Sequence, residues 1–545
     1  MTDSFDFSNK VIELIDDLKS VCANYGLGND GNEYRIITQI FLYKFLHDKF
    51  IDEIKGIKSE LRKSQNWEQY LANLSADEYE LLTMKLGEGI AVFQSKQLIS
   101  SLFSKQNEAN FADIFDSALR EIALLNADIF SVVTGGGEKI ALFENLSRYV
   151  SDNRDDFCRA IINKLVGFSF ENIFNEGFDF FATIFEYLIK DYNSDSGGKY
   201  AEYFTPHSVS GIMANCLVPD SLEGEISDVT CYDPSAGSGT LLMNLAHKIG
   251  EDKCTIFSQD IAQKSSNLLR LNLILNGLVH SIHNIIQGNS LVAPFHKDRN
   301  GALKKFDFIV SNPPFKLDFS EFRSDLEIEE NNDRFFAGIP KIPPKEKESM
   351  AIYLPFLQHV IYSLKPTGKA AVVVPTGFLT VKNKIEKKIR QKLVNEKMLA
   401  GVINMPTNIF AKTGTNVSIL FIDKTNQDEV ILIDASSLGE KVKQGNNQKT
   451  VLRSTDIEKI LTSYTSKKKI DGFSIAVTYE DLKTKDYSFN PAIYFDIKID
   501  YEDISPEEFS KRINESLAKL DDFANESEIL KNQIANNLLN LDYEV

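Results

Sequence analysis

The chain has 545 residues, of which 43% are hydrophobic and 25% are charged. This composition excludes a disordered or fibrous protein, and the length suits about three or four domains. The formal net charge of −18 at pH 7 argues against a chain that wraps nucleic acid alone, because contacts from Lys and Arg to phosphate supply most of that affinity. Nucleic acid stays open as a substrate if a partner supplies the basic surface.

The cysteines and the N-terminus indicate the compartment. Five cysteines are scattered along the chain and form no Cys-x-x-Cys pair. This spacing supports neither a zinc site nor a disulfide framework, so we expect no metal and a reducing environment. The first ten residues, MTDSFDFSNK, are acidic and polar, unlike a secretory signal, and no apolar run approaches the length of a membrane span. We therefore expect a cytoplasmic protein without a membrane partner.

Residues 1–165 are predicted to form an N-terminal helical domain. Apolar residues recur at helical spacing in 9–22, 33–54, 111–125 and 157–170. We see no strand-turn-strand pattern between them. None of these stretches carries a recognisable chemical motif, so we expect this domain to serve packing or partner binding.

Residues 166–430 change to short apolar runs that alternate with helical patterns. The runs at 229–233, 254–260 and 306–310 are typical strands, and further runs follow at 369–375 and 399–404. Alternation of this kind predicts β-α-β units and a mostly parallel sheet with helices on both faces. The fold class is therefore α/β and Rossmann-like.

The last part of the chain is polar. Residues 431–500 are lysine-rich and are expected to be a connecting region. Residues 501–545 carry apolar side chains at heptad-like intervals, which predicts a long helix or a short coiled coil. Because such a helix needs a partner for its apolar side, we expect it to dock another subunit.

A glycine turn is the first candidate for chemistry. In YDPSAGSGT, Asp233 ends a strand, and Gly237 and Gly239 lie in the turn before the next helix. Glycines let a backbone approach a ligand, and a helix N-terminus offers free N–H groups, although a tight turn also needs glycine for structural reasons. Asp260 ends the next strand, where a carboxylate can accept from both ribose hydroxyls. The pair indicates an adenosine-type cofactor, and the spacing suits a dinucleotide about as well as a nucleoside.

A second candidate ends the strand in FDFIVSNPPF. An amino group on a base is a poor nucleophile, because its lone pair is delocalised into the ring. Two acceptors, Asn312 Oδ1 and the Pro313 carbonyl, can localise that lone pair, since the prolines hold the backbone without N–H donors. Phe315 can stack on a base that has been flipped out of a duplex. A Pro-Pro strand terminator with a buried Phe explains the same residues, and the motif alone does not decide between the two.

Six segments in this order resemble the amino-methyltransferases of DNA, and closely the modification subunits of type I restriction–modification systems. That family joins an N-terminal helical domain to a methyltransferase core and ends in a helical tail. The segments are GKYAEYFTPHSVSGIMA (198–214), DPSAGSGTLL (233–242), SQDI (258–261), FDFIVSNPPF (306–315), FLQHVIYSLKPTGKAAVVVPTGFL (356–379) and NIFAKTGTNVSILFI (408–422).

The resemblance implies a Rossmann-like core that uses S-adenosyl-L-methionine and methylates adenine at N6. The catalytic residues would be Asn312, Pro313, Pro314 and Phe315. The cofactor would be bound by Glu202, Tyr203, Phe204, Thr205, Pro206, His207, Asp233, Ser235, Ala236, Gly237, Ser238 and Asp260. No Pro-Cys dipeptide occurs, so a cytosine C5 mechanism has no nucleophile.

Two segments depart from a simple match. In QGNSL, Asn289 stands where the family typically has an aspartate that accepts from the adenine amine of the cofactor. We expect Asn289 to keep an acceptor oxygen but to form a weaker bond, because the charge is lost. Residues 318–349 are charged and are expected to form a loop near the target base, in which Arg334 and Phe335 act or which is solvated and flexible.

The resemblance also implies partners. These are double-stranded DNA, a specificity (S) subunit, a second modification (M) subunit and a restriction (R) nuclease-translocase subunit. The alternatives are a methyltransferase-fold scaffold without catalysis and an amino-methyltransferase that acts on protein glutamine or RNA.

Overall fold

The structure is a computed structural model that describes residues 2–28, 31–63, 67–170, 174, 178–189, 205–222, 224–410, 416–427, 429–444, 447–495 and 504–539. The chain divides into two units, Met1–Phe495 and Asp496–Val545. The domain limits expected from the sequence stay predictions, but the described part of 431–495 belongs to the first unit and not to a separate linker.

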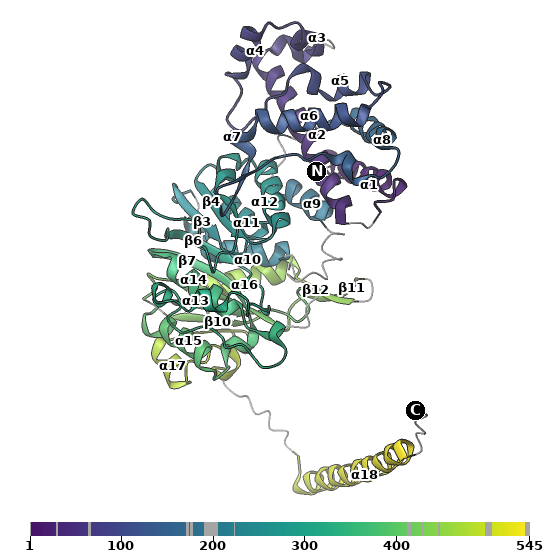
Figure 1. The fold of residues 1–545 in the computed structure, drawn as a ribbon. Coiled ribbons are helices and arrows are strands. Elements are labelled where there is room, and N and C mark those ends of the chain that lie inside the picture. The colour runs from purple at the N-terminus through teal and green to yellow at the C-terminus, as the bar shows by residue number, and fades with distance from the viewer. Residues whose placement is uncertain are drawn as a thin grey trace. The chain divides into compact units, whose positions relative to one another are not determined.

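Helices dominate the first part of the chain, as the apolar periodicity predicts (Figure 1). They bury long rows of Ile, Leu and Phe against one another, and helices α6 and α8 pack together. The helices are α1 (Thr2–Asn24), α2 (Gly31–Ile57), α3 (Trp67–Ala72), α4 (Ala76–Thr83), α5 (Ile99–Ser104), α6 (Phe111–Leu125), α7 (Ala127–Phe130), α8 (Arg154–Val166) and α9 (Phe178–Ile189).

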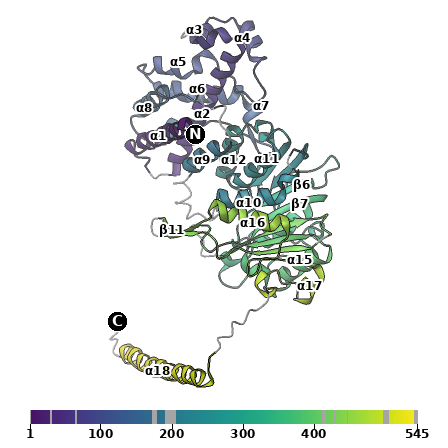
Figure 2. The same ribbon diagram turned by 180° about the vertical axis from the view of Figure 1, so that it is seen from behind.

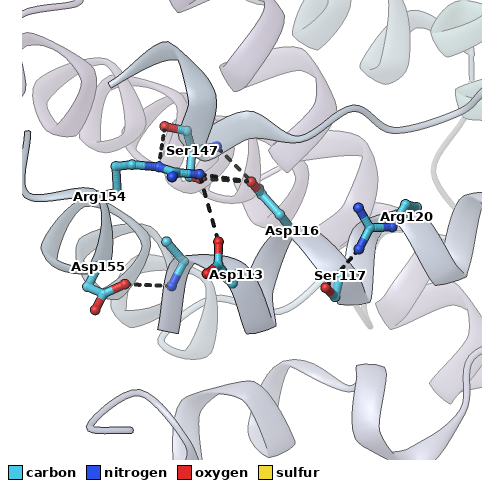
Figure 3. Close-up of polar contacts among 8 residues, drawn as sticks. Asp113, Asp116, Ser117, Arg120, Ser147, Arg154 and Asp155 are labelled. Atoms are coloured by element: carbon cyan, nitrogen blue, oxygen red, sulfur yellow. Dashed lines mark hydrogen bonds and ion pairs between the residues drawn. The ribbon is translucent and has the colours of Figure 1, made fainter. Parts of the chain in front are cut away.

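A polar network fastens helix α8 to helix α6 (Figure 3). Arg154 Nε lies 3.0 Å from Ser147 Oγ, and Arg154 Nη2 lies 3.9 Å from Asp116 Oδ2. Ser147 Oγ donates to the same carboxylate oxygen at 2.8 Å. Burial raises the pKa of Asp116, while the bonds from Ser147 and the charge of Arg154 oppose that shift. These contacts satisfy a carboxylate that would be costly to bury alone, which is a structural role.

The expectation that no strands interrupt residues 1–165 was wrong. Strands β1 (Val132–Thr134) and β2 (Lys139–Ile140) pair as a hairpin, and β1 also pairs in parallel with β5 (Ile285–Gln287). Three successive glycines at 135–137 let the chain reverse, with Gly137 at φ +87°. The strands are too short for alternation to reveal them, but β-branched residues beside a glycine run are a hairpin signal.

The predicted α/β fold is confirmed. One sheet of eleven strands has the order β13-β10-β8-β9-β7-β6-β3-β4-β5-β1-β2. It is parallel from β7 through β6, β3, β4 and β5 to β1, and β9 runs antiparallel between β7 and β8. The remaining strands are β3 (Val229–Asp233), β4 (Cys254–Asp260), β6 (Phe306–Ser311), β7 (Leu364–Pro375), β8 (Leu399–Asn404), β9 (Val417–Asp423), β10 (Val430–Asp434) and β13 (Ser474–Val477).

Two groups of helices cover this sheet. In the first, α10 contacts α11 and α16, and α11 contacts α12; Figure 2 shows α10 beside α16. In the second, α14 packs on β7 and contacts α15. The helices are α10 (His207–Leu217), α11 (Thr240–Ile249), α12 (Gln263–Leu275), α13 (Arg323–Leu326), α14 (Tyr353–Ser363), α15 (Lys384–Asn395), α16 (Ser454–Ser466) and α17 (Tyr479–Thr484). A separate hairpin joins β11 (Glu440–Gln444) to β12 (Asn447–Val451).

The second unit contains helix α18 (Pro506–Leu539), which matches the predicted long helix. None of its described residues is buried. Its large apolar side chains are therefore exposed, among them Phe509, Leu517, Phe523 and Ile534. Its expected docking role stays a prediction.

Candidate cofactor and base site

The candidate residues gather at one edge of the sheet because their strands are parallel neighbours. Strand β3 lies between β6 and β4. The carboxyl ends of these three strands carry Asp233, Asp260 and Asn312. In open α/β sheets this edge is where ligands bind. The topology thus brings the three residues to one edge of the sheet, and their sharing of a ligand site stays a prediction.

The two glycines of the turn have different roles. A Cβ added to Gly239 would lie 2.2 Å from Leu269 Cδ1, and the residue has φ +82°, so packing of helix α12 against the turn requires glycine there. Gly237 has φ +53°, and an added Cβ would meet no described atom within 4 Å. Gly239 therefore serves packing, whereas no described atom crowds the Cβ position of Gly237.

Asp233 is a buried acid held by two serines. Its Oδ1 accepts from the Ser235 backbone N–H at 2.9 Å, and Ser235 Oγ lies 2.8 Å from Ser311 Oγ. The side chain is 1% exposed. Burial raises the pKa of Asp233 to about 7, the bonds from Ser235 and Ser311 oppose the shift, and the charge of Asp260 adds to it. This carboxyl is poised to change its charge when a cation arrives.

Asp260 is fixed by backbone donors from both sides. Its Oδ2 accepts from the Gly237 N–H at 3.0 Å, and its Oδ1 accepts from the Ala262 N–H at 2.9 Å. The glycine turn and the residues that follow β4 thus orient the carboxylate.

Asn312 is oriented by Thr205, which lies 107 positions earlier in the chain. Asn312 Nδ2 donates to Thr205 Oγ1 at 3.0 Å. Because the amide nitrogen faces Thr205, its other arm, Oδ1, is left as an acceptor. Thr205 is buried, and Asn312 is partly exposed. The base-gripping interpretation requires an amide held in this way, and a simple strand terminator does not.

Phe315 is largely buried against other side chains, and its ring is not a freely exposed surface for stacking. Its side chain is 9% exposed, and its ring meets the edge of the Tyr353 ring with centroids 6.4 Å apart. Pro313 is buried and Pro314 is partly exposed. The NPPF segment therefore ends the strand and packs the Phe315 ring against Tyr353. Stacking of Phe315 on a base stays a prediction.

Asn289 is already engaged within its own loop. Its Oδ1 accepts from the backbone N–H groups of Leu291 at 3.0 Å and Val292 at 3.3 Å. The oxygen that was expected to receive an adenine amine is therefore occupied by the backbone. An aspartate in this place would have a second oxygen to offer, whereas Asn289 offers only N–H donors on its other arm.

The segment before helix α10 is described in part. Glu202, Tyr203 and Phe204 lie outside the described residues. Pro206 is the N-cap of α10, and His207 is its first residue. The His207 N–H donates to the Glu186 carboxylate, whose pKa is raised by burial in spite of that bond. Ala236 and Ser238 lie in the glycine turn, and the Ala236 carbonyl accepts from the Gly239 N–H at 2.8 Å.

Sequence reasoning did not single out Ser290 and Ser311. Ser290 Oγ donates to the Pro234 carbonyl at 2.5 Å and so ties the loop after β5 to the glycine turn. Ser311 bonds to Ser235 and also to the Asp233 carboxyl, where it opposes the rise in pKa that burial causes. Both serines are buried next to predicted site residues, so their positions beside Asn289 and Asn312 were the available signal.

Residues 318–349 are partly packed and partly exposed. Phe319, Leu326, Phe335 and Ile339 build a small core with Leu291 and Met350. Arg334 is 2% exposed, and its Nη2 donates to the Leu291 carbonyl. Of the two alternatives for this segment, a fully solvated loop does not agree with this core, and a role of Arg334 and Phe335 at the target base stays a prediction.

Three further features of the described residues concern metal-ligating groups, cysteines and membrane-spanning helices. No group of three or more potential metal-ligating side chains occurs among the described residues. All five cysteines are buried and free: Cys22, Cys158, Cys216, Cys231 and Cys254. Within the described ranges, every helix is too short or too polar to cross a membrane.

Known structures define the class of fold. A type I restriction-modification system methyltransferase subunit from Streptococcus thermophilus superposes with a TM-score of 0.71, at 23% sequence identity, over 90% of this chain and 100% of that one. A modification subunit of a type I restriction enzyme from Vibrio vulnificus gives a TM-score of 0.53 at 17% identity, over 87% of this chain and 93% of that one. The core thus has the Rossmann-like α/β fold of the methyltransferases.

The family follows from the sequence comparison. Residues 176–503 match the N-6 DNA methylase family, and the chain belongs to it. It is 28% identical over 356 residues to the type I restriction enzyme MpnII methylase subunit of Mycoplasma pneumoniae, over 63% of this chain and 62% of that protein. It is 26% identical over 447 residues to the HindI methylase subunit of Haemophilus influenzae, over 78% of this chain and 93% of that protein. The matched part thus spans less than two thirds of the Mycoplasma relative.

Proposed function

We propose that this chain is the methylating subunit of a type I restriction–modification complex and transfers a methyl group from S-adenosylmethionine to N6 of adenine in double-stranded DNA. The observation that carries the proposal is the Thr205–Asn312 contact, which leaves an amide oxygen as acceptor at the ligand edge of the sheet. Family membership and the names of the relatives support the same substrate.

The residues present fit S-adenosylmethionine. No described atom crowds the Cβ position of Gly237, the carboxylate of Asp260 is held beside the glycine turn where ribose hydroxyls would lie, and buried Asp233 can balance positive charge. When bound, the cofactor would supply an electrophilic methyl group. Thr205, Pro206 and His207 border the same site in this proposal. Among the predicted site residues that the structure describes, Asn289 fits poorly, since its acceptor oxygen is occupied.

The chain's own residues would act by orientation. Asn312 Oδ1 and the Pro313 carbonyl accept the two N–H bonds of the adenine amine, which localises the nitrogen lone pair toward the methyl group. Phe315 and Pro314 shape the wall against which the ring lies. The gain comes from alignment and exclusion of water, so no general base with a shifted pKa is needed for methyl transfer.

Partners would supply what the chain lacks. With a net charge of −18, the chain needs a separate specificity subunit to read the sequence and to contact most phosphates. A second modification subunit and a restriction subunit would complete the complex. The exposed apolar side chains of α18 offer a docking surface for a partner helix.

The test is adenine methylation by the reconstituted complex on a duplex substrate, read by mass spectrometry of nucleosides. Asn312→Ala and Phe315→Ala should each abolish N6-methyladenine in chains that still fold cooperatively. Phe315→Ala should lower the thermal transition, because it removes a buried ring, whereas Asn312→Ala should leave it nearly unchanged. Full activity in both variants would contradict the assignment of this site. Methylated glutamine or RNA in place of DNA would identify another amine substrate, and no cofactor binding with or without partners would identify a scaffold.

A further inference from the structure

A cavity lies at the edge of the sheet opposite the candidate site. It has a volume of about 410 Å³ and is lined by Lys305, Lys392 and Lys424 and by the rings of Phe336 and Tyr362. Lys305 directly precedes β6, whereas Asn312 directly follows it. At about 3.3 Å per residue, the two ends of this strand are roughly 20 Å apart. A ligand here is therefore separate from the cofactor and from the target base.

The three lysines come from three elements and lie close enough to repel one another. Lys305 precedes β6, Lys392 is in α15, and Lys424 follows β9. Burial first, and then the charge of Lys424, lowers the pKa of Lys305 to about 8. Burial and the charge of Lys392 lower the pKa of Lys424. Positive charge is thus concentrated here in a chain whose net charge is strongly negative.

Two of the lysines bond to backbone carbonyls at the C-terminus of helix α14, and each keeps further N–H donors. Lys305 Nζ donates to the Tyr362 carbonyl, and Lys424 Nζ donates to the Leu364 carbonyl at 3.0 Å. Both carbonyls lie at the end of α14, where ammonium groups commonly satisfy free acceptors. Each ammonium has three N–H donors, so one bond per lysine does not exhaust its capacity.

Acidic side chains around the cavity do not balance the lysines. The acids that line it are Asp333, which is exposed, and Glu396, which pairs with Lys392 at 2.5 Å. The lining residues thus include three lysines and two acids, so the charge balance of the cavity is positive.

We propose that this cavity binds the di- or triphosphate group of a small molecule. Lysines on three separate elements match an anion with several charges better than a single phosphate, which carries at most about two. The volume lies within the usual range for small-molecule pockets, about 300–1,000 Å³. A duplex that presents its base to Asn312 approaches the opposite edge, so its backbone is not the expected occupant.

The test is calorimetric titration of the full chain with pyrophosphate and, separately, with ATP, at low ionic strength and pH 7. Binding of both with similar affinity would indicate that the phosphates alone are recognised. Tighter binding of ATP would indicate a nucleotide site, with the nucleoside against Tyr362 or Phe336. No heat from either probe would overturn the proposal. Binding of a short duplex that is weakened in Lys392→Gln and Lys424→Gln would then assign the cavity to DNA phosphates.

Two variants in the cavity and one control variant outside it test whether pyrophosphate binds at these lysines. Lys392→Gln and Lys424→Gln should each weaken pyrophosphate binding by about tenfold, as expected for loss of one charge-assisted contact. Lys388→Gln removes the same charge one turn earlier in α15, where the side chain is exposed and does not line the cavity. Its affinity should equal that of the unchanged chain. Equal losses in all three variants would show general charge attraction and overturn the site.

A measurement on the unchanged chain covers the case in which a variant fails to fold. Acetylation of lysines, followed by mass spectrometry, should show Lys305, Lys392 and Lys424 protected by pyrophosphate, with Lys388 reacting at the same rate with and without it. Unchanged reactivity of all four lysines under saturating pyrophosphate contradicts the proposal.

Discussion

The amide of Asn312 is held by Thr205, with Nδ2 donating to Oγ1 at 3.0 Å. This one contact separates the two interpretations of the NPPF segment. A strand terminator needs no oriented amide, whereas an amine-binding site needs Oδ1 to face the ligand. Thr205 is therefore best understood as a positioning residue for Asn312, in addition to its expected place near the cofactor.

Thr205→Val should slow methyl transfer without comparable loss of cofactor affinity. Valine keeps the shape of threonine but removes the acceptor, so the Asn312 amide is free to turn. Loss of a neutral hydrogen bond costs about 0.5–1.5 kcal/mol, which corresponds to a rate decrease of up to about tenfold. Single-turnover methylation measures the rate, and calorimetry measures cofactor affinity. Thr205→Ser keeps the hydroxyl and should restore the rate; failure of this rescue would point to packing as the cause.

Gly239→Ala should mainly lower the stability of the fold, whereas Gly237→Ala should mainly weaken cofactor binding. An added methyl at Gly239 meets Leu269 Cδ1 at 2.2 Å, and overpacking of this kind costs about 1–3 kcal/mol, so the melting temperature should fall. The methyl at Gly237 meets no described atom within 4 Å. It should cost only about 1–2 kcal/mol of backbone strain but should occupy space that the cofactor needs. Differential scanning calorimetry and cofactor titration of both variants distinguish these effects, and equal cofactor affinities would contradict the assignment.

Asn289→Asp should strengthen cofactor binding. The aspartate can accept from Leu291 and Val292 with one oxygen and from the adenine amine with the other, whereas Asn289 has its acceptor occupied. One charge-assisted hydrogen bond of about 1.4 kcal/mol or more corresponds to at least roughly tenfold in affinity. Asn300→Asp makes the same change at an exposed position of the following loop and should leave the affinity unchanged. Weaker cofactor binding by Asn289→Asp would show that the adenine of the cofactor does not lie next to residue 289.

Local patterns in the sequence were enough for much of the fold but not for contacts between distant segments. Periodicity located α6 and β4 at their observed limits because each is a continuous, strongly patterned run. The β1–β2 hairpin was missed because two or three residues cannot show alternation. The core of residues 318–349 was missed because its apolar residues are far apart in a charged segment. The Thr205–Asn312 bond joins residues that carry no pairing signal in a single sequence.

If Asp233 binds the cofactor as proposed, its raised pKa predicts that cofactor affinity depends on pH. Burial raises this pKa to about 7, so near pH 6 the carboxyl is mostly protonated and neutral, and near pH 8 it is mostly charged. A ligand with sulfonium and ammonium groups favours the charged carboxylate, so binding lowers the pKa and releases a proton. Affinity for S-adenosylmethionine should therefore increase as the pH rises from 6 to 8 and level off above the pKa of the free protein.

Calorimetry in buffers of different ionisation enthalpy measures both the affinity and the protons released. In Asp233→Asn the oxygen that accepts from the Ser235 N–H is retained, but the titrating group is gone, so the affinity should be lower and nearly independent of pH over this range. A pH dependence that persists unchanged in Asp233→Asn would mean that another group titrates on binding. S-adenosylhomocysteine, which lacks the sulfonium charge, provides the ligand control, because its affinity for the unchanged protein should rise less between pH 6 and 8.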